Sequence, residues 1–277
     1  MKRLLLAFPF ALAACDSPAT APLPSTHRSL AITATGTCTF TTVGSTNYLN
    51  GDCTTPTSIV VPNGETLDGG GFTITAVDPA FGHFLGAVIT NGGAVANVTN
   101  VRVTASGLSD VCDAGADRLR GILFEGAGGS ITGTVVTGVR QGLSGCQEGN
   151  AIEVRNAPFD GTGSDLLVNI SGNQVSDYQK NGITVNGAVA ATVTDNTVAG
   201  DGPVSYIAQN GIQISRGATA IVQANAVSQN DYTGFDVACG ILLFDAGGVK
   251  ESTNRFSKNE RNMCNFGKGG GKFNPTP

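Results

Sequence analysis

The sequence predicts an all-β fold, a parallel β-helix solenoid of about seven coils with disulfide-stapled caps. Three observations favour this fold. The 277 residues include 39 glycines and no tryptophan, and only 13% of them are charged, which suits short strands and tight turns better than helices. A small residue followed by Ile recurs every 29 to 31 residues, and an Asn follows at a nearly constant distance. Regular repeats of this length are typical of solenoids.

Residues 1–14 have the pattern of a signal peptide. Lys2 and Arg3 precede the apolar stretch Leu4–Ala14, which is too short to cross a bilayer as a mature helix. The sequence "LAAC" that ends at Cys15 resembles the lipobox of bacterial lipoproteins. This resemblance implies cleavage before Cys15 and a lipid on its sulfur, which would anchor the protein to the bacterial cell envelope, facing the periplasm or the exterior. The alternative is an ordinary signal peptide with an incidental cysteine.

Residues 15–37 are rich in Pro, Ser and Thr and lack a periodic apolar face, so they are predicted to be a flexible tether.

Without Lys2 and Arg3 the chain keeps 14 basic and 21 acidic residues, a net charge of −7. A chain with no basic stripe is not expected to bind nucleic acid. The oligomeric state is left open.

Six cysteines follow Cys15, and an even number in an exported chain favours disulfides. Fifteen pairings are open, and pairing of neighbours in sequence is the simplest. A metal site is the alternative, but no Cys-x-x-Cys cluster supports it. The predicted pairs are Cys38–Cys53, Cys112–Cys146 and Cys239–Cys264.

The repeat begins each time at a small residue followed by Ile, with Ile at positions 122, 152, 183, 212 and 241. Apolar residues then alternate with outward ones, which is the periodicity of a strand. The outward positions form two columns. These are Leu123, Glu153, Thr184, Gln213 and Leu242, and then Glu125, Arg155, Asn186, Ser215 and Phe244.

A second feature of the repeat is an Asn that precedes another short strand. It stands 13 residues after Ile183, Ile212 and Ile241, while Thr134 occupies the place in an earlier unit. We expect these side chains to stack at a turn of each coil, to tolerate the left-handed backbone conformation there, and to hydrogen-bond along the ladder. The predicted ladder consists of Asn173, Asn196, Asn225 and Asn254.

The repeat resembles the right-handed parallel β-helix family with the pectate-lyase-like fold, over about Ser58–Asn259. "SIVVPNGETLDGGGFTITA" (Ser58–Ala76) is similar to the first coil of such exported proteins. A β-sandwich would not need so regular a register, and the frame of leucine-rich repeats is missing. Residues 38–57 are expected to cap the first coil, 58–259 to form the β-helix, and 260–277 to cover its last coil.

In this family the working groove usually lies outside the strands that carry the Gly-Ile pairs. Charged side chains on neighbouring coils there suit binding of an acidic polysaccharide, because a cation neutralises a uronate carboxylate and a base accepts its α-proton. The plainer interpretation is a surface ion pair between Glu125 and Arg155. The candidate charged residues are Arg120, Glu125, Glu153, Arg155 and Lys180.

Two further groups are candidates for binding. Tyr178 and Tyr232 precede Gly-Ile strands and would stack on sugars, although loop tyrosines often only cover a core. Asp110, Asp113 and Asp117 stand close together in one loop and would supply oxygen ligands to Ca²⁺, the one cofactor that the sequence suggests. The alternative is a solvated acidic loop.

Two functions follow. The first is an envelope lipoprotein that binds or scaffolds at a glycan through its polar outer face. It is favoured because the catalytic motifs of polygalacturonases and alginate epimerases are missing, and because the only histidines are His27 and His83. The alternative is a lyase or epimerase acting on an acidic polysaccharide, which rests on the charged residues and on likeness of fold.

Overall fold

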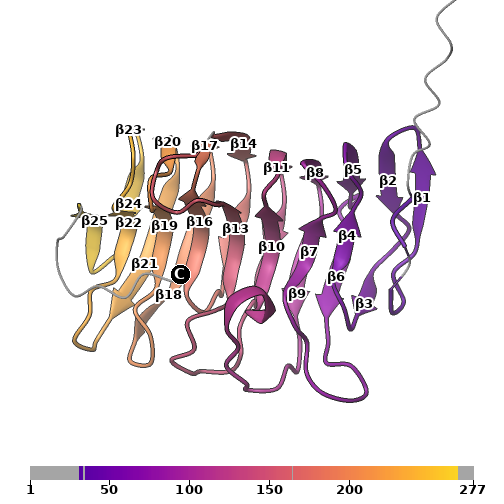
Figure 1. The fold of residues 1–277 in the computed structure, drawn as a ribbon. Helices are drawn as coiled ribbons and strands as arrows, with labels where there is room; N and C mark the ends of the chain where they lie inside the picture. Colours follow the sequence, from indigo (N-terminus) through magenta and orange to yellow (C-terminus); the bar gives the residue numbers. More distant parts are fainter. Residues whose placement is uncertain (1–30, 34, 164, 268–277) are drawn as a thin grey trace, which may run out of the picture.

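The computed structural model describes residues 31–33, 35–163 and 165–267, and its chain winds into a parallel β-helix (Figure 1). The predicted fold class is confirmed: three sheets run along the solenoid, and η1 (Gly115–Asp117) is the one helical turn in this part. No helix there has the length and hydropathy needed to cross a bilayer. The signal segment and Cys15 lie outside the described residues.

Eight parallel strands form what we name the Gly-Ile sheet. Its register pairs each repeat Ile with the next, from Ile122 through Ile152 to Ile241, as the sequence predicts. The last strand lies in the segment that was expected only to cover the final coil, so the sheet continues one strand further. In order the strands are β4 (Ile59–Val61), β7 (Ala87–Asn91), β10 (Arg120–Glu125), β13 (Asn150–Asn156), β16 (Asn181–Gly187), β19 (Asn210–Ser215), β22 (Cys239–Phe244) and β25 (Arg261–Phe266).

The other two sheets complete each coil. The hairpin sheet comprises β1 (Phe40–Val43), β2 (Thr46–Leu49), β5 (Glu65–Asp68), β8 (Val95–Thr99), β11 (Gly128–Thr132), β14 (Leu166–Ser171), β17 (Val189–Thr194), β20 (Thr219–Gln223) and β23 (Val249–Ser252). The third sheet comprises β3 (Cys53–Thr55), β6 (Thr73–Ala76), β9 (Arg102–Ala105), β12 (Val135–Val136), β15 (Gln174–Ser176), β18 (Thr197–Val204), β21 (Ala226–Tyr232) and β24 (Arg255–Ser257).

An Asn ladder runs along the turn between the hairpin sheet and the third sheet. Asn173 Nδ2 donates to Asn196 Oδ1 at 2.9 Å, and the same bond joins Asn196 to Asn225 and Asn225 to Asn254. Thr134 begins the ladder by donating its backbone N–H and its hydroxyl to Asn173. Each Asn also holds the backbone of its neighbours, so the ladder satisfies turn groups that are buried away from water.

The left-handed backbone conformation falls one residue earlier than predicted. The residues before the ladder positions have positive φ, among them Gly172 (67°), Asp195 (57°) and Ala224 (57°). Each Asn side chain accepts the backbone N–H of the preceding ladder residue and donates to a backbone carbonyl. The ladder residue itself therefore lies just after the left-handed turn, where the next strand begins.

Both ends of the described solenoid carry a disulfide. Cys38–Cys53 ties the antiparallel β1–β2 hairpin to β3, and Cys239–Cys264 ties β22 to β25. Cys112–Cys146 joins two long loops in the middle of the molecule. The predicted tether reaches residue 37, but Ile32 is buried and its N–H donates to Asn47 Oδ1, so the packed body begins earlier.

The outer face of the Gly-Ile sheet is less accessible to solvent than the alternation of apolar and outward residues in the sequence suggests. Side chains of both predicted outward columns are buried, including Thr184, Gln213 and Asn186. Part of the cover comes from the loop that leads from β13 to β14, which turns back over the sheet (Figure 1) and brings Phe159 against Gly187. Strand parity therefore predicts which way a side chain points, but not whether solvent reaches it.

Candidate functional site

Arg120 and Glu153 form a buried ion pair between β10 and β13. Arg120 Nε donates to Glu153 Oε2 at 2.6 Å, and the two side chains are 1% and 2% exposed. The other guanidinium nitrogens donate to the carbonyls of Arg118 at 2.8 Å and Gly115 at 3.2 Å. Every group of Arg120 that would bind a uronate is thus occupied. The prediction that Arg120 and Glu153 face a substrate is contradicted by this burial.

Arg155 and Glu125 lie outside that pair. Their strands place them side by side, with Arg155 Nε 3.3 Å from Glu125 Oε1, and Arg155 Nη1 is 3.8 Å from Glu153 Oε1. The Arg155 guanidinium also stacks over the Phe159 ring at 4.9 Å. These contacts agree with the plainer interpretation of the sequence, an ion pair between Glu125 and Arg155, in which Glu125 is half exposed. Because the Glu125 carboxylate is 54% exposed, solvent screens the pair, and it contributes little to stability.

Tyr178 is fully buried and does not form a sugar platform. Its hydroxyl donates to Asn230 Oδ1 at 2.5 Å, and burial raises the pKa of Tyr178 well above its usual value. Asn230 belongs to a second, shorter amide ladder with Asn259, which the repeat analysis missed. Tyr178 thus packs inward, while Tyr232 stays partly accessible.

Lys180 stands immediately before β16, at the end of a loop that several buried side-chain amides hold in place. Gln179 donates to the carbonyls of Ser144 and Cys146 and accepts the Gln141 N–H at 2.6 Å, while Gln209 donates to the Tyr178 carbonyl at 2.6 Å. These buried amides tie the loops of neighbouring coils together. They fix the backbone from which the Lys180 side chain projects.

The Lys180 side chain is buried beside a small cavity of about 100 Å³. Its residue is 5% exposed, and Nζ donates one hydrogen bond, to the Ala208 carbonyl at 2.9 Å. Burial lowers the pKa of Lys180 to about 8, and the Asp236 carboxylate partly opposes that shift. We name this cavity the Lys180 pocket. Its other polar lining residues are Gln147, Tyr206, Tyr232 and Asp236.

Sequence reasoning found two members of the Lys180 pocket, Lys180 and Tyr232, and missed the rest. Tyr206 and Asp236 each precede a Gly-Ile strand, in "YIAQNGI" and "DVACGI", so their position in the repeat is a signal that could have found them. Gln147 comes from a long irregular loop that no repeat predicts. Its Oε1 atom is buried and lacks a hydrogen-bond partner.

The three aspartates of the predicted Ca²⁺ loop do not converge. Asp113 accepts from His83 Nε2, with 2.9 Å between Nε2 and Oδ2, whereas Asp110 lies against Gly142 in a different loop. Asp117 ends η1, and its carbonyl accepts the Gly86 N–H. Within the described residues the three carboxylates do not gather into a group that could hold a metal ion, so they do not form one set of oxygen ligands.

One group of metal-ligating types does come together in the described part of the chain, Cys112, Cys146 and Glu148, within 4.8 Å. Its two sulfur atoms are joined in a disulfide. Burial raises the pKa of Glu148, whose oxygens accept the N–H groups of Asp113 and Leu119. This group acts as a clamp between two loops.

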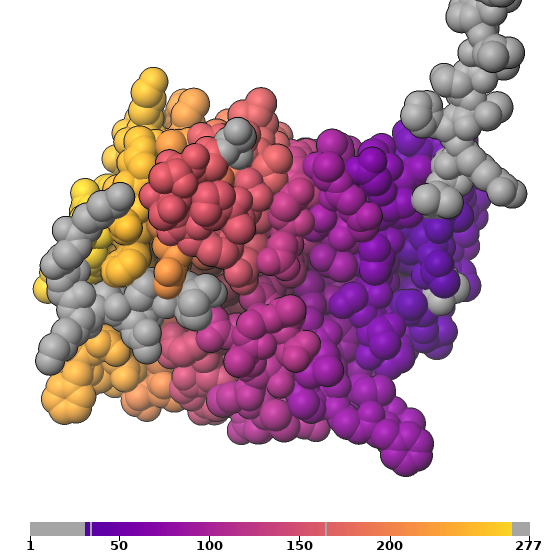
Figure 2. All heavy atoms as spheres, viewed as in Figure 1, coloured from indigo at the N-terminus to yellow at the C-terminus, as the bar shows by residue number. Residues whose placement is uncertain are grey.

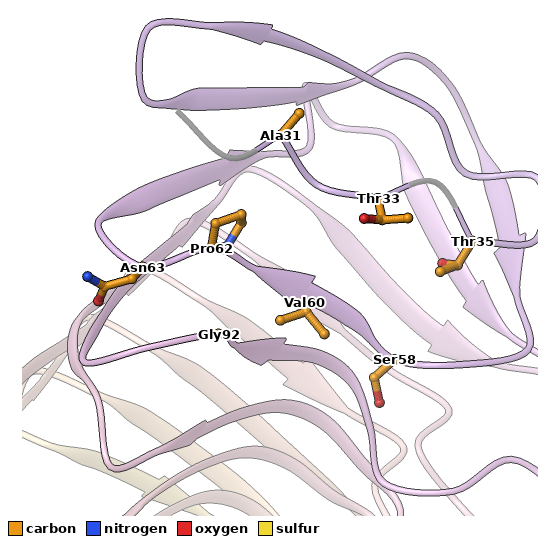
Figure 3. Close-up of a pocket in the computed structure, with 8 residues that line it drawn as sticks. All are labelled: Ala31, Thr33, Thr35, Ser58, Val60, Pro62, Asn63 and Gly92. Atoms are coloured by element: carbon orange, nitrogen blue, oxygen red, sulfur yellow. The ribbon is translucent and has the colours of Figure 1, made fainter. Parts of the chain in front are cut away.

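A second depression, of about 460 Å³, lies over β4 at the N-terminal end (Figure 3). Residues 31–33 and Thr35 face β4 across it. The lining carries no ionisable side chain, so it offers no acid or base. The residues are Ala31, Thr33, Thr35, Ser58, Val60, Pro62, Asn63 and Gly92.

Comparison with known proteins identifies a family for this chain. No curated protein sequence and no solved structure is significantly similar to this chain. The family model described as periplasmic copper-binding protein (NosD) matches residues 73–277, which covers the β-helix from its third-sheet strand β6 onward. A match over most of the chain, on a parallel β-helix, identifies the protein as a member of the NosD family.

Proposed function

We propose that this chain is an envelope lipoprotein whose β-helix binds a carboxylate-bearing glycan at the Lys180 pocket. The observation that carries the proposal is a buried ammonium group with a single hydrogen bond, Lys180 Nζ to the Ala208 carbonyl, beside a cavity. An ammonium has three donors, so two remain for a ligand. A buried cation of this kind gains much from an anionic partner.

The size and lining of the pocket favour one carboxylate rather than a whole sugar. A cavity of about 100 Å³ admits a carboxylate group, while the ring that bears it would remain outside, beside Tyr206 and Tyr232. Tyrosine offers both an apolar face and a hydroxyl to such a ring. The buried Gln147 Oε1 lacks a partner, and because it is an acceptor it would take a hydrogen bond from a sugar hydroxyl and not from the carboxylate.

The anchor is a second part of the proposal. The NosD family is described as periplasmic, which agrees with an exported chain. We place the lipid on Cys15, outside the described residues, with the segment before Ile32 as the link to the body. Loss of membrane association in Cys15→Ser is the expected result, and fractionation that leaves this variant in the membrane would exclude the lipid.

Copper, which the family description names, does not fit the residues described. Copper sites use imidazole, thiolate and thioether ligands. In residues 31–267 all six cysteines form disulfides, His83 bonds to Asp113, and Met263 lies on the terminal strand β25, far along the sheet from that histidine. We therefore assign no role to copper in this part of the chain.

Calorimetry of the mature chain with hexagalacturonate tests the glycan proposal. Lys180→Met should weaken binding at least about tenfold, since it removes a charge-assisted contact. Lys250→Met, which removes an exposed lysine from β23, should leave the affinity unchanged. Affinity should fall as the pH rises through about 8, the pKa of Lys180. Equal affinities in both variants would refute the proposal.

A lyase or epimerase remains the second candidate, because an amine with a pKa of about 8 can accept a proton near neutral pH. In a lyase step the Lys180 amine would take the C5 proton of a uronate, the bond from C4 to the glycosidic oxygen would break, and that oxygen would leave with a proton from water, giving an unsaturated sugar. Turnover measured by absorbance of that product should then disappear in Lys180→Ala and survive in Arg155→Ala, because Arg155 is engaged by Glu125 and Phe159. Absence of product in the wild-type chain would dismiss the lyase.

A further inference from the structure

A larger cavity, of about 650 Å³, opens at the N-terminal end of the edge that also carries the Lys180 pocket. Its walls are the segment before β4 and the loop 77–86 between β6 and β7, which protrudes from the body (Figure 2). The volume is in the range of sites that hold small molecules. We name it the Phe81 pocket. The residues that matter here are Thr57, Ser58, Phe81 and His83.

The loop that carries Phe81 is anchored on both sides of the ring. Before it, Asp78 accepts the N–H groups of Phe84 at 2.9 Å and Ser109 at 2.7 Å. After it, Phe84 is fully buried and His83 Nε2 lies 2.9 Å from Asp113 Oδ2. Asp113 in turn follows Cys112, whose disulfide to Cys146 holds the neighbouring loops. The loop is thus fixed by groups that belong to three coils.

Phe81 itself is 95% exposed, so the anchored loop holds an apolar ring out in water. Such a ring contributes nothing to the core and costs hydration free energy. A single exposed apolar residue is common on a surface, but here the ring borders a cavity with polar groups at fixed positions. The ring and the cavity together form a platform on which a flat apolar face can stack.

The polar groups of the cavity suit hydroxyls and not charges. The hydroxyls of Thr57 and Ser58 donate no hydrogen bond to the described residues. Because Nε2 of His83 is bonded to Asp113, its Nδ1 is the ring atom left to bond a ligand, and a hydroxyl can donate to it or accept from it. The Asp113 carboxylate is engaged by the histidine. A ligand with an apolar face and a ring of hydroxyls, and no charge, satisfies this arrangement.

We propose that the Phe81 pocket binds an uncharged pyranose unit of a glycan, with the sugar face on Phe81 and its hydroxyls on Ser58 and His83. This inference rests on the proposed glycan-binding function and adds a second subsite to it. The two pockets lie on the same edge, and β7 and β16 are three strands apart, which is about 15 Å along the solenoid. One extended glycan would therefore meet both.

The test uses hexagalacturonate and its fully methyl-esterified form as matched probes, with the mature chain. The esterified probe lacks carboxylates and should report the Phe81 pocket. Phe81→Ala should weaken its binding by about tenfold, the upper range for an aromatic contact. His83→Gln should weaken it as well. Phe235→Ala is the matched control, since Phe235 is equally exposed on the loop between β21 and β22 and lines neither pocket.

The outcomes separate the two subsites. Binding of the esterified probe that Phe81→Ala weakens and Phe235→Ala does not would support the Phe81 pocket. No binding of that probe, or equal loss in both variants, would overturn it. The glycan proposal for Lys180 is judged separately, because Lys180→Met should weaken only the acidic probe. If Lys180→Met does not weaken binding of the acidic probe, the Lys180 proposal fails, but the result for the esterified probe still decides on the Phe81 pocket.

Discussion

Asn196 is a ladder residue whose side-chain oxygen and nitrogen are both fully hydrogen-bonded. Its Oδ1 accepts from the N–H and Nδ2 of Asn173, and its Nδ2 donates to Asn225 and to the Ile170 carbonyl. Asn196→Ala would leave several of these buried groups without partners, each at a cost of about 1–3 kcal/mol. We expect the free energy of unfolding in urea to fall by about 2–4 kcal/mol.

Asn169→Ala is the matched control for that measurement. Asn169 is exposed on β14, and its side chain donates only to Ser171. Its removal should change stability by no more than about 0.5 kcal/mol. A similar loss in the two variants would mean that the ladder does not stabilise the coils more than an ordinary surface bond does.

The lowered pKa of Lys180 predicts that the free energy of unfolding depends on pH. Its folded pKa of about 8 lies below the ordinary value of 10.5, so between these values the unfolded chain binds more protons and stability rises with pH. The gain over that window is on the order of 3 kcal/mol. Lys180→Met should abolish this rise. The measurement is the urea midpoint from pH 7 to pH 10.5, compared between the two chains, and parallel curves would contradict the buried ammonium.

At the scale of the strand, the repeat in the sequence predicts the structure well. The alignment on Ile122, Ile152, Ile183 and their successors is the register of the Gly-Ile sheet, because stacking of identical side chains and parallel hydrogen bonds both follow the same period. Thr134 occupies the ladder place that spacing assigned to it. Features that recur in each coil were therefore predictable.

The candidate site was less predictable, because it depends on loops that do not repeat. Nothing in the strand pattern indicates that Arg120 donates to carbonyls of the η1 segment, which removes it and Glu153 from the surface. The repeat that placed Arg155 in an outward column and Lys180 just before a Gly-Ile strand could not reveal that Lys180 is buried and that Arg155 is paired with Glu125. Gln147 entered the pocket from such a loop.

At the scale of the whole molecule, the solenoid depends on closed ends. Each coil contacts only its neighbours, so an exposed terminal coil offers strand edges for pairing with another chain. The β1–β2 hairpin pairs with β5 and so occupies the edge of the first full coil in the hairpin sheet, and the Thr37 N–H donates to the Thr54 carbonyl on β3. The Cys38–Cys53 disulfide fastens this cap.

Removing that disulfide should therefore do more than lower stability. A double variant, Cys38→Ser with Cys53→Ser, should lose about 3 kcal/mol, the value for a loop of this length, and should also self-associate as the cap opens. Cys112→Ser with Cys146→Ser is the matched control, because it frees lateral loops and exposes no strand edge. Sedimentation velocity over a range of concentrations distinguishes them. Association in the control alone, or in neither variant, would show that this cap does not protect the strand edges at the N-terminal end of the solenoid.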